Sequence, residues 1–414
     1  MPVRKVKYNR KRANTRLLTL HGGTILGYGK RSTLVYTIDD LLKHLPRVLR
    51  ICIVSFTSSP KAKGRRDPPR CLSGGAISID SKLSQDQGLQ NVAIKDCGES
   101  AKAMSAVVGE VAWNQKVHKW FEQANALGLT SLHPATSHLE IIHRRAPAQS
   151  SFRTTNRVIT VSQDGTTIIN NKSSDETSNP VSAMIQKRVL PVYRECDGSL
   201  FDLNIMHRLT EPELMLMCRR VLQFLQVLHA KQHIHMDVKP DNILFVYDDT
   251  TRAYDFCLSD YETLEAANQI ASRIRRKGRF PQGTDTYMSP MLTADDTENK
   301  VYHNFIAVAK VCLDTDLSNT EFEAIVHAAK KNIDRNIYKV DLHSLALSLL
   351  DLILPAPLSA NTNSPIEHAR ILRNALKKFP KTKKLLPRLM FFNARTDFYD
   401  AESALAALVE MSSR

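Results

Sequence analysis

The chain has 414 residues, of which 43% are hydrophobic and 24% charged, and its formal net charge is +15. This length can build two lobes with their own cores, and the composition is typical of a globular protein. No run of 18 apolar residues suggests a membrane span, and the basic N-terminus lacks the apolar core of a secretion signal. The positive charge favours polyanionic partners such as nucleic acid, phosphoproteins or acidic substrate segments, although a basic surface that only aids solubility fits it equally well.

Cysteine usage bears on the compartment. The seven cysteines are scattered and form no CxxC pair, which argues against a disulfide scaffold or a zinc ribbon and indicates a reducing environment. We therefore expect an intracellular protein of the cytoplasm, the nucleus or both. The cysteines are Cys52, Cys71, Cys97, Cys196, Cys218, Cys257 and Cys312.

The first part of the chain alternates strand-like and polar segments. Residues 1–18 form a basic arm, read either as a nuclear signal or as a frayed tail, and residues 23–38 are strand-like. Residues 39–55 have helical apolar spacing, which predicts a helix. Residues 56–90 are rich in Ser, Pro, Gly and basic side chains, which predicts a loop.

A strand at 90–96 and a helix near 100–124 come next, and residues 145–181 form a second polar stretch with few apolar anchors. The remainder is helical. Thr210 and Glu213 form a capping box, and the segment 342–354 is apolar almost all round, which is typical of a buried helix. A strand-rich half followed by a helical half predicts an α+β protein with two segregated lobes. The stripe after the capping box is Leu214, Cys218, Val221, Leu225 and Leu228.

The strongest motif is His235-Met-Asp237-Val-Lys239-Pro-Asp-Asn242. Phosphoryl transfer needs a carboxylate that orients the attacking hydroxyl, a cation near the migrating phosphate and an oxygen ligand for magnesium. Asp237, Lys239 and Asn242 supply these on one short loop. The alternative is a polar turn before a hairpin. The motif resembles the HRDxKxxN catalytic loop of eukaryotic protein kinases, and Lys239-Pro240 resembles their serine/threonine branch.

The resemblance extends to the nucleotide side. The strand Val92–Lys95 resembles the VAIK strand, whose lysine holds the α and β phosphates of ATP. Glu110, fifteen residues later on the predicted helix, stands where the family has the glutamate that pairs with this lysine. Taken alone, Lys95 and Glu110 would each be ordinary surface residues, so the prediction rests on their register.

Residues 27–34 resemble the glycine-rich loop GxGxxGxV, with Ser32 in place of the third glycine. Glycines allow backbone N–H groups to approach phosphates, so the resemblance implies that Gly27, Gly29 and Leu34 bind the nucleotide. The distance from this loop to the lysine strand makes residues 39–90 an insert.

Two candidates compete for the metal-binding DFG motif. Asp255-Phe256-Cys257 keeps the Asp-Phe pair, whereas Asp260-Tyr261-Glu262 lies five residues later. The family's preceding strand alternates apolar, exposed, apolar and small residues, and 256–259 fit this order better than 251–254 do. We therefore favour Asp260, with Asn242, as the magnesium ligands and keep Asp255 as the alternative. Either choice replaces the family's glycine, which affects the hinge of this loop.

Residues 283–291 resemble GTxxYMAPE, the end of a kinase activation segment, which implies a protein substrate. Thr286 is the candidate for the threonine that contacts the catalytic aspartate. Met291 replaces the glutamate of APE, so its pair with a buried arginine, for which Arg395 is the positional candidate, should be absent. A further motif around Asp341 resembles the family's DxWSLG helix, whose aspartate ties down the catalytic-loop backbone, and His343 stands in the tryptophan's place as a structural residue.

The predicted architecture is a bilobal protein-kinase-like fold. It comprises the arm 1–18, a small strand-rich N-lobe over 19–195 with inserts at 39–90 and 145–181, and a helical C-lobe over 196–414 with a helical insert at 297–335. The fifty residues between Met291 and Asp341 require that last insert. The divergence and the inserts resemble kinases of large DNA viruses.

The predicted function is an ATP- and Mg²⁺-dependent serine/threonine protein kinase. Asp237 would orient the substrate hydroxyl and Lys239 would stabilise phosphate charge. The alternatives are a pseudokinase that acts as a nucleotide- or protein-binding module, and a nucleic-acid-associated protein on a kinase scaffold. Met236 replaces the arginine that clamps an activating phosphate in most protein kinases, which predicts activity without such a phosphate. Five cations of the activation segment are expected either to recruit acidic or already phosphorylated protein substrates or to form only a solvated basic loop: Arg273, Arg275, Arg276, Lys277 and Arg279.

Overall fold

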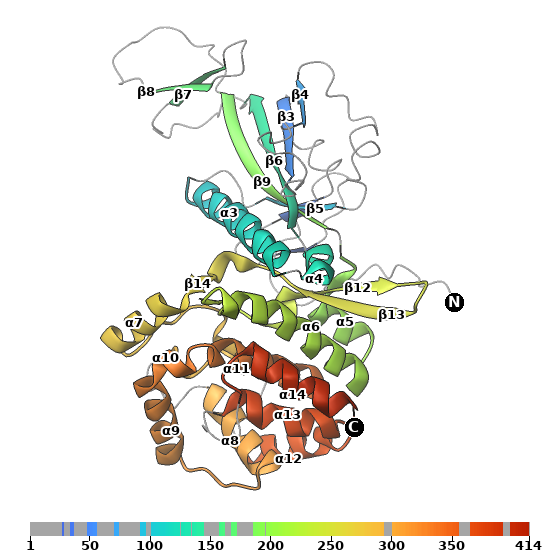
Figure 1. The fold of residues 1–414 in the computed structure, drawn as a ribbon, viewed down its shortest axis with the longest axis vertical. Helices are drawn as coiled ribbons and strands as arrows, with labels where there is room; N and C mark the ends of the chain where they lie inside the picture. Colours follow the sequence, from blue (N-terminus) through green and yellow to red (C-terminus); the bar gives the residue numbers. More distant parts are fainter. Residues whose placement is uncertain are drawn as a thin grey trace.

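The computed structural model has a strand-rich part, drawn at the top of Figure 1, and a helical part below it. This arrangement confirms the predicted α+β architecture with two lobes. For strands β1–β9 the structure describes the backbone alone. The described residues are 27–28, 34–36, 48–55, 70–73, 92–96, 101–124, 126–133, 135–144, 157–161, 167–171, 185–194, 196–293, 300–355, 365–391 and 398–413.

The strand-rich part is built on a seven-stranded antiparallel sheet in the order β1-β2-β5-β9-β6-β3-β4. A separate hairpin pairs β7 with β8. The strands are β1 (Gly27–Tyr28), β2 (Leu34–Tyr36), β3 (Val48–Ser55), β4 (Arg70–Ser73), β5 (Val92–Asp96), β6 (Ala135–Arg144), β7 (Arg157–Val161), β8 (Thr167–Asn171) and β9 (Ile185–Arg194).

Two sequence-based predictions fail in this sheet. Residues 48–55 form strand β3, not the end of a helix, and residues 70–73 of the predicted loop form strand β4, which pairs with it. The run Val-Leu-Arg-Ile-Cys-Ile-Val is rich in β-branched residues, and these favour a strand when neighbouring strands offer pairing. Part of the predicted 39–90 insert therefore extends the sheet. The polar stretch 145–181 likewise contains the β7–β8 hairpin.

Helix α3 (Ala101–Gln123) joins the two parts, because it packs on β9 and also on the helical part. It is followed by the short helix α4 (Leu127–Leu132). The predicted strand at 90–96 and helix near 100–124 are confirmed as β5 and α3. Because α3 touches both parts, a side chain on its buried face can reach the space between the sheet and the helical part.

The helical part has α6 and α11 at its centre, and none of the described helices combines the length and apolarity that a membrane crossing needs. Small sheets β10-β12-β13 and β11-β14 lie next to α6. The helices are α5 (Leu200–Met206), α6 (Glu211–Ala230), α7 (Ala267–Lys277), α8 (Lys300–Cys312), α9 (Asn319–Lys331), α10 (Ile333–Asn336), α11 (Lys339–Ile353), α12 (Pro365–Leu376), α13 (Pro380–Met390) and α14 (Ala401–Ser413). The strands are β10 (Gly198–Ser199), β11 (His233–Ile234), β12 (Ile243–Asp248), β13 (Ala253–Leu258) and β14 (Glu265–Ala266).

Helix α6 begins as its sequence predicts. The Glu213 carboxylate accepts hydrogen bonds from the Thr210 backbone N–H and hydroxyl, each at 2.7 Å, which completes the capping box. Its apolar stripe is buried in the main core. The helix ends just before β11, and the predicted catalytic loop follows directly after that strand.

Helix α11 is buried along its whole length, although it contains charged and polar residues. Its end at Ile353, two residues before Pro355, agrees with the predicted buried helix. His343 is fully buried, and desolvation lowers the pKa of this histidine to about 4, so its ring is neutral at pH 7. A buried neutral ring fits the structural role predicted for His343.

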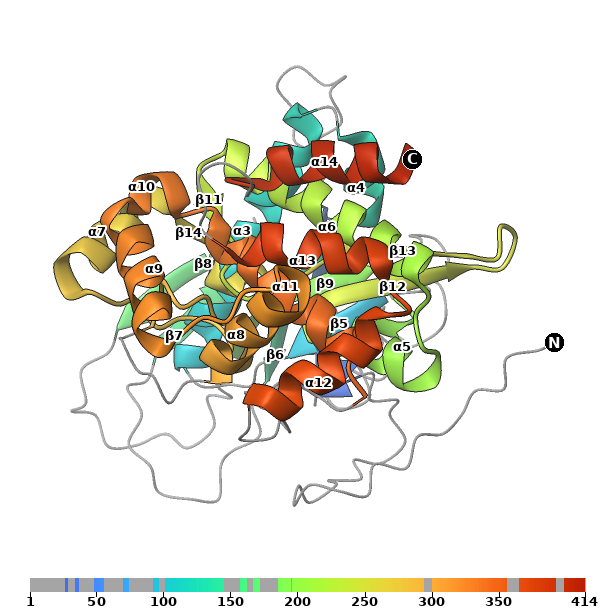
Figure 2. The ribbon, with the colours of Figure 1, turned by 90° about the horizontal axis from the view of Figure 1, so that it is seen from below.

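Helices α8, α9 and α10 occupy the predicted insert at 297–335. Phe305 of α8 is fully buried, and its ring lies 4.1 Å from the Phe391 ring. The segment therefore forms part of the core and is no peripheral loop. Figure 2 shows from below that α7, α9 and α10 lie together at one side of the helical part.

Candidate active site

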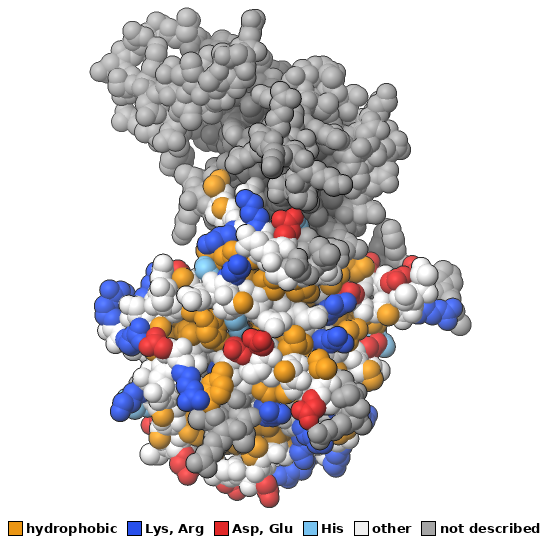
Figure 3. Space-filling view, viewed as in Figure 1, with side chains coloured by type: hydrophobic (Ala, Val, Ile, Leu, Met, Phe, Trp, Pro, Cys, Tyr) orange, Lys and Arg blue, Asp and Glu red, His pale blue; other side chains and the backbone are white. Residues whose placement is uncertain are grey.

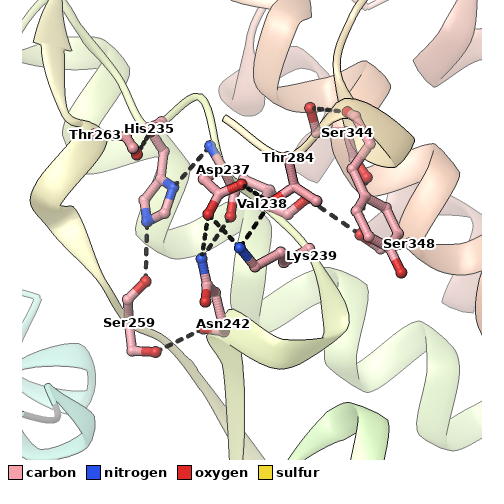
Figure 4. Close-up of polar contacts among 11 residues, drawn as sticks. His235, Asp237, Val238, Lys239, Asn242, Ser259, Thr263, Thr284, Ser344 and Ser348 are labelled. Atoms are coloured by element: carbon pink, nitrogen blue, oxygen red, sulfur yellow. Dashed lines mark hydrogen bonds and ion pairs between the residues drawn. The ribbon is translucent and has the colours of Figure 1, made fainter. Parts of the chain in front are cut away.

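The predicted catalytic loop, residues 235–242, connects β11 to β12 and brings the three side chains predicted to act in catalysis close together (Figure 4). Lys239 forms an ion pair with the Asp237 carboxylate. The Asn242 amide nitrogen donates to the same aspartate, at 2.9 Å to its backbone carbonyl oxygen and at 3.0 Å to Oδ2, the oxygen that Lys239 also contacts. The sequence-predicted residues Asp237, Lys239 and Asn242 thus lie together on one loop.

The Asp237 carboxyl is ionised at neutral pH. Burial alone would raise its pKa, but the Lys239 ammonium and a hydrogen bond from Thr284 hold that pKa below its usual value. The Thr284 hydroxyl donates to Asp237 Oδ1 at 2.7 Å and accepts from Lys239 Nζ at 2.8 Å. An ionised carboxylate of low basicity can accept a hydrogen bond from a substrate hydroxyl and orient it.

The catalytic loop is joined to the chain segment after β13 by His235 and Ser259. Ser259 donates its backbone N–H and its hydroxyl to the Asn242 carbonyl oxygen, at 2.9 and 2.8 Å. His235 Nδ1 accepts from the Asp237 backbone N–H at 3.3 Å, so Nε2 carries the hydrogen and donates to the Ser259 carbonyl at 3.1 Å. Asp260, the next residue after Ser259, therefore lies directly beside the loop that contains Asn242.

The two candidates for the metal-binding aspartate lie in different places. Asp255 is within β13 opposite Val246, and its carboxylate accepts two hydrogen bonds from Arg220 of α6, at 2.7 and 3.2 Å. Asp260 follows the strand end, where Leu258 pairs with Ile243, the residue after Asn242. Its φ of +65° is a left-handed conformation that turns the chain out of the strand. This placement puts Asp260, and not Asp255, next to the catalytic loop.

Tyr261 connects the catalytic loop to helix α3 through a series of rings. The Tyr261 side chain is fully buried, and its hydroxyl donates to the Leu258 carbonyl at 2.9 Å. Its ring stacks on His133 at 5.6 Å and meets the edge of His235 at 5.5 Å, while His133 contacts Phe121 of α3 at 5.6 Å. A movement of α3 would therefore reach the catalytic loop. This series of ring contacts is not predicted from the sequence, where the aromatic residue after Asp260 is the one signal for it.

Four polar residues of α11 hold the loop and the activation segment from below. The Asp341 carboxylate accepts the backbone N–H groups of His235 at 2.9 Å and Met236 at 2.8 Å. The Ser344 hydroxyl donates to the Tyr287 carbonyl at 2.8 Å, and the Ser348 hydroxyl to the Val238 carbonyl at 3.3 Å. Asp351, one turn further on, accepts the Tyr287 hydroxyl at 2.6 Å.

Asp341 has the backbone-holding role that the motif around it implied. Ser348 and Asp351 were not found from the sequence. Their spacing after Asp341 and Ser344 is the only signal for them, since it places all four residues on one helical face.

Gly283 allows the activation segment to pass close to the catalytic loop. Its φ of +105° favours glycine, and a Cβ at this position would lie 2.3 Å from the Met236 carbonyl oxygen. This approach brings the next residue, Thr284, to Asp237. The threonine at the catalytic aspartate is thus Thr284, and the choice of Thr286 was wrong. The GTxxY pattern itself has its threonine at position 284, whereas Thr286 stands at one of its variable positions.

Met236 packs against an apolar face of the activation segment. Helix α7 buries Ala267, Ile270, Ala271 and Ile274 in a cluster that includes Met236. Its opposite face carries exposed cations, which Figure 3 shows at the left edge of the molecule. Met291, which replaces the glutamate of the APE motif, is fully buried in the same cluster and makes apolar contacts there. Arg395, the predicted partner of that glutamate, lies outside the described residues.

The nucleotide-side predictions lie mainly outside the described side chains. Gly27 is on β1 and Leu34 on β2, and β2 pairs with β5, with Val35 opposite Lys95. The backbone thus places β2 next to the lysine strand, whereas Gly29 and the Lys95 side chain are not among the described parts. Glu110 of α3 is buried, with 3% of its surface exposed.

The residues at the end of β13 fit a magnesium ion that substrate phosphates and water help to coordinate. In the described part of the chain, no three His, Cys, Asp or Glu residues come together as a metal cage. Magnesium commonly takes one or two protein oxygens and completes its shell with phosphates and water. The Asn242 nitrogen is used by Asp237, so its amide oxygen is the atom of this side chain that suits a magnesium ion.

Comparison with known proteins finds kinases. Residues 179–308 match the family profile described as protein kinase domain. Serine/threonine-protein kinase pak-2 of Caenorhabditis elegans is 44% identical over 59 residues, 14% of this chain and 11% of its own length. Human serine/threonine-protein kinase PAK 4 is 33% identical over 95 residues, 23% of this chain and 15% of its own length. Human serine/threonine-protein kinase 10 is 28% identical over 117 residues, 27% of this chain and 11% of its own length. Each match thus spans a small part of the relative.

Proposed function

Because the chain carries a protein kinase domain of the eukaryotic serine/threonine type, we propose that it is an active enzyme that transfers the γ-phosphate of ATP to Ser or Thr hydroxyls of protein substrates. The observation that carries this proposal is the assembly of Asp237, Lys239 and Thr284 into one hydrogen-bonded group. This group joins the catalytic loop to the activation segment, which in protein kinases forms a shelf for the peptide substrate.

In this proposal the Asp237 carboxylate accepts a hydrogen bond from the substrate hydroxyl and points its oxygen toward the phosphate. Lys239 keeps a positive charge beside it, which offsets the charge that develops on the transferred group. Thr284 holds both side chains in position, since its hydroxyl donates to one and accepts from the other. The low pKa of Asp237 favours orientation of the hydroxyl over early removal of its proton.

Asn242 and Asp260 are the proposed magnesium ligands, and Lys95 with Glu110 the proposed holders of the ATP phosphates. Bound magnesium would neutralise phosphate charge during transfer. Gly27, Gly29 and Leu34 are proposed to line the nucleotide site, as their resemblance to the glycine-rich loop implies. The backbone pairing of β1 and β2 beside the Lys95 strand supports this set.

A pseudokinase that binds nucleotide or protein is the second candidate. The sequence Asp-Tyr-Glu in place of DFG and the buried Met291 favour it. The assembled catalytic loop speaks against it, because a pure binding module has no need for an ionised Asp237 held by a lysine and a threonine. Phosphotransfer distinguishes the two directly.

We also propose that the substrates include acidic or already phosphorylated proteins. Arg275, Arg276 and Lys277 at the end of α7 are exposed and form a basic surface on the activation segment. The comparisons do not support the nucleic-acid partner that the net charge allowed. An intracellular place of action, in the cytoplasm or nucleus, and the resemblance to kinases of large DNA viruses remain predictions.

Phosphotransfer from labelled ATP with magnesium to a Ser/Thr protein substrate is the decisive assay. We expect activity in the wild type and a loss of about 10²–10⁴-fold in kcat for Asp237→Asn, which removes the orienting carboxylate. Lys95→Ala should abolish activity without unfolding the protein. Asp248→Asn, on the exposed end of β12, is the matched control and should retain activity. ATP binding by the wild type without any phosphotransfer would establish the pseudokinase instead.

The magnesium ligand is tested by two matched variants. Asp260→Asn should remove the magnesium dependence of ATP binding, measured by calorimetry with and without the metal. Asp255→Asn should retain it and cost only about 0–1 kcal/mol of stability, because the Arg220–Asp255 pair is partly exposed. The reverse pattern would move the metal site to Asp255.

Regulation is tested with phosphatase. Because α7 is held by apolar contacts around Met236, we expect phosphatase-treated protein to keep its activity. Ile270→Ala, which removes a fully buried contact of α7, should lower activity, while Arg276→Ala on the exposed face should leave ATP affinity unchanged. Loss of activity after dephosphorylation would show that another cation clamps a phosphate and that the apolar contacts are not sufficient.

A further inference from the structure

A pocket lies in the helical part, and none of its lining residues belongs to the catalytic loop. It has a volume of about 1390 Å³ and is lined by residues of α8, α9, α10, α12 and α13 and of the loops beside them. All of its lining residues come after residue 308, where the match to the protein kinase domain ends. The pocket is therefore built by the insert helices and the C-terminal helices and is separate from the matched region.

All the charged side chains that line the pocket are positive. Six lysines and arginines line it and no carboxylate does, so an empty pocket has a positive potential that an anion would relieve. Two of the arginines are held in place by rings: Arg335 lies 4.3 Å from the Tyr399 ring centre and donates to its hydroxyl at 2.7 Å, and Arg388 lies 4.3 Å from Phe398. The six are Arg335, Arg373, Lys377, Lys383, Lys384 and Arg388.

The floor and part of the rim are apolar. Leu317 and Ile325 line the pocket and are only partly buried, and Leu313 at its edge has 47% of its surface exposed. An exposed leucine beside partly buried aliphatic side chains marks a surface that an apolar group can cover. A ligand that fits must therefore combine negative charge with a bulky apolar side chain.

We propose that this pocket docks an acidic linear segment of a partner protein, with a large apolar residue on the floor and flanking Asp or Glu residues against the cationic wall. Charge complementarity selects this occupant. A nucleic acid fits less well, because stacking of bases needs open aromatic faces. The Tyr399 ring is already in contact with Arg335 and Lys339, and Phe391 is buried against Phe305.

The docking site does not depend on phosphotransfer, since binding can be measured without ATP. It lies next to the activation segment, because α9 and α10, which line the pocket, also contact α7. A segment bound there would be held near the proposed substrate surface, and failure of the kinase assay would leave the binding result unaffected.

The test is fluorescence anisotropy on the full chain without nucleotide. The probe is a labelled short peptide in which Phe-Leu is flanked by glutamates. Lys383→Glu changes an exposed lysine of the pocket wall, and Lys378→Glu is its matched control, an exposed lysine nearby that does not line the pocket. Ala328→Trp fills the pocket from an exposed position on α9 without a change of charge.

We expect Lys383→Glu and Ala328→Trp each to weaken binding about tenfold or more, and Lys378→Glu less than about twofold. A peptide with Ser-Ser in place of Phe-Leu should bind about tenfold more weakly than the probe. Equal losses in Lys383→Glu and Lys378→Glu, or equal binding of the two peptides, would overturn the proposal in favour of general charge attraction. Tighter binding of a thymidine oligonucleotide that Ala328→Trp blocks would overturn it in favour of a nucleic-acid site.

Discussion

The site depends on the hydrogen bonds that the buried carboxylate of Asp341 accepts. It accepts three hydrogen bonds: two from the backbone of His235 and Met236, and one from His229 Nε2 at 3.0 Å. The backbone N–H of Ala401 donates to His229 Nδ1, which leaves the hydrogen on Nε2 for Asp341. A buried carboxylate is costly unless its oxygens are satisfied, so the helix, the loop and the start of α14 are fixed together. This anchoring holds the backbone from which Asp237 extends.

A second constraint orders the activation segment by apolar packing. Met236 has a left-handed backbone, with φ of +65°, and its side chain is buried against α7. In the proposed enzyme, this contact would take the place of the arginine–phosphate contact that orders the segment in most protein kinases. Gly283 also passes close to the Met236 carbonyl oxygen, so both the backbone and the side chain of Met236 lie against the segment. The exposed cations of α7 and the cationic pocket then lie on neighbouring elements, which suits partners that carry negative charge.

The sequence predicted the parts of the site that are local. Asp237, Lys239 and Asn242 are within six residues, so their spacing alone places them on one loop, and the two lobes follow from the change in apolar periodicity. It failed where tertiary contacts decide. The sequence predicts a helix for strand β3 because the pairing of β3 with β4 and β6 is not visible in its own residues, and it predicts Thr286 where the contact at Gly283 brings Thr284 to Asp237. The basic pocket is formed by helices far apart in the chain, which no local pattern reveals.

Hydrogen exchange over residues 233–243 in Asp341→Asn tests the central claim most directly. An asparagine can accept at one atom only, so at least one loop N–H loses its partner, at a cost of about 1–3 kcal/mol. The matched control is Asp351→Asn, a buried carboxylate on the same helix that accepts the Tyr287 hydroxyl and no catalytic-loop N–H. The account predicts faster exchange in the loop and lost phosphotransfer for Asp341→Asn, with slow loop exchange retained in Asp351→Asn. Unchanged loop exchange in Asp341→Asn, or an equal increase in both variants, would contradict it.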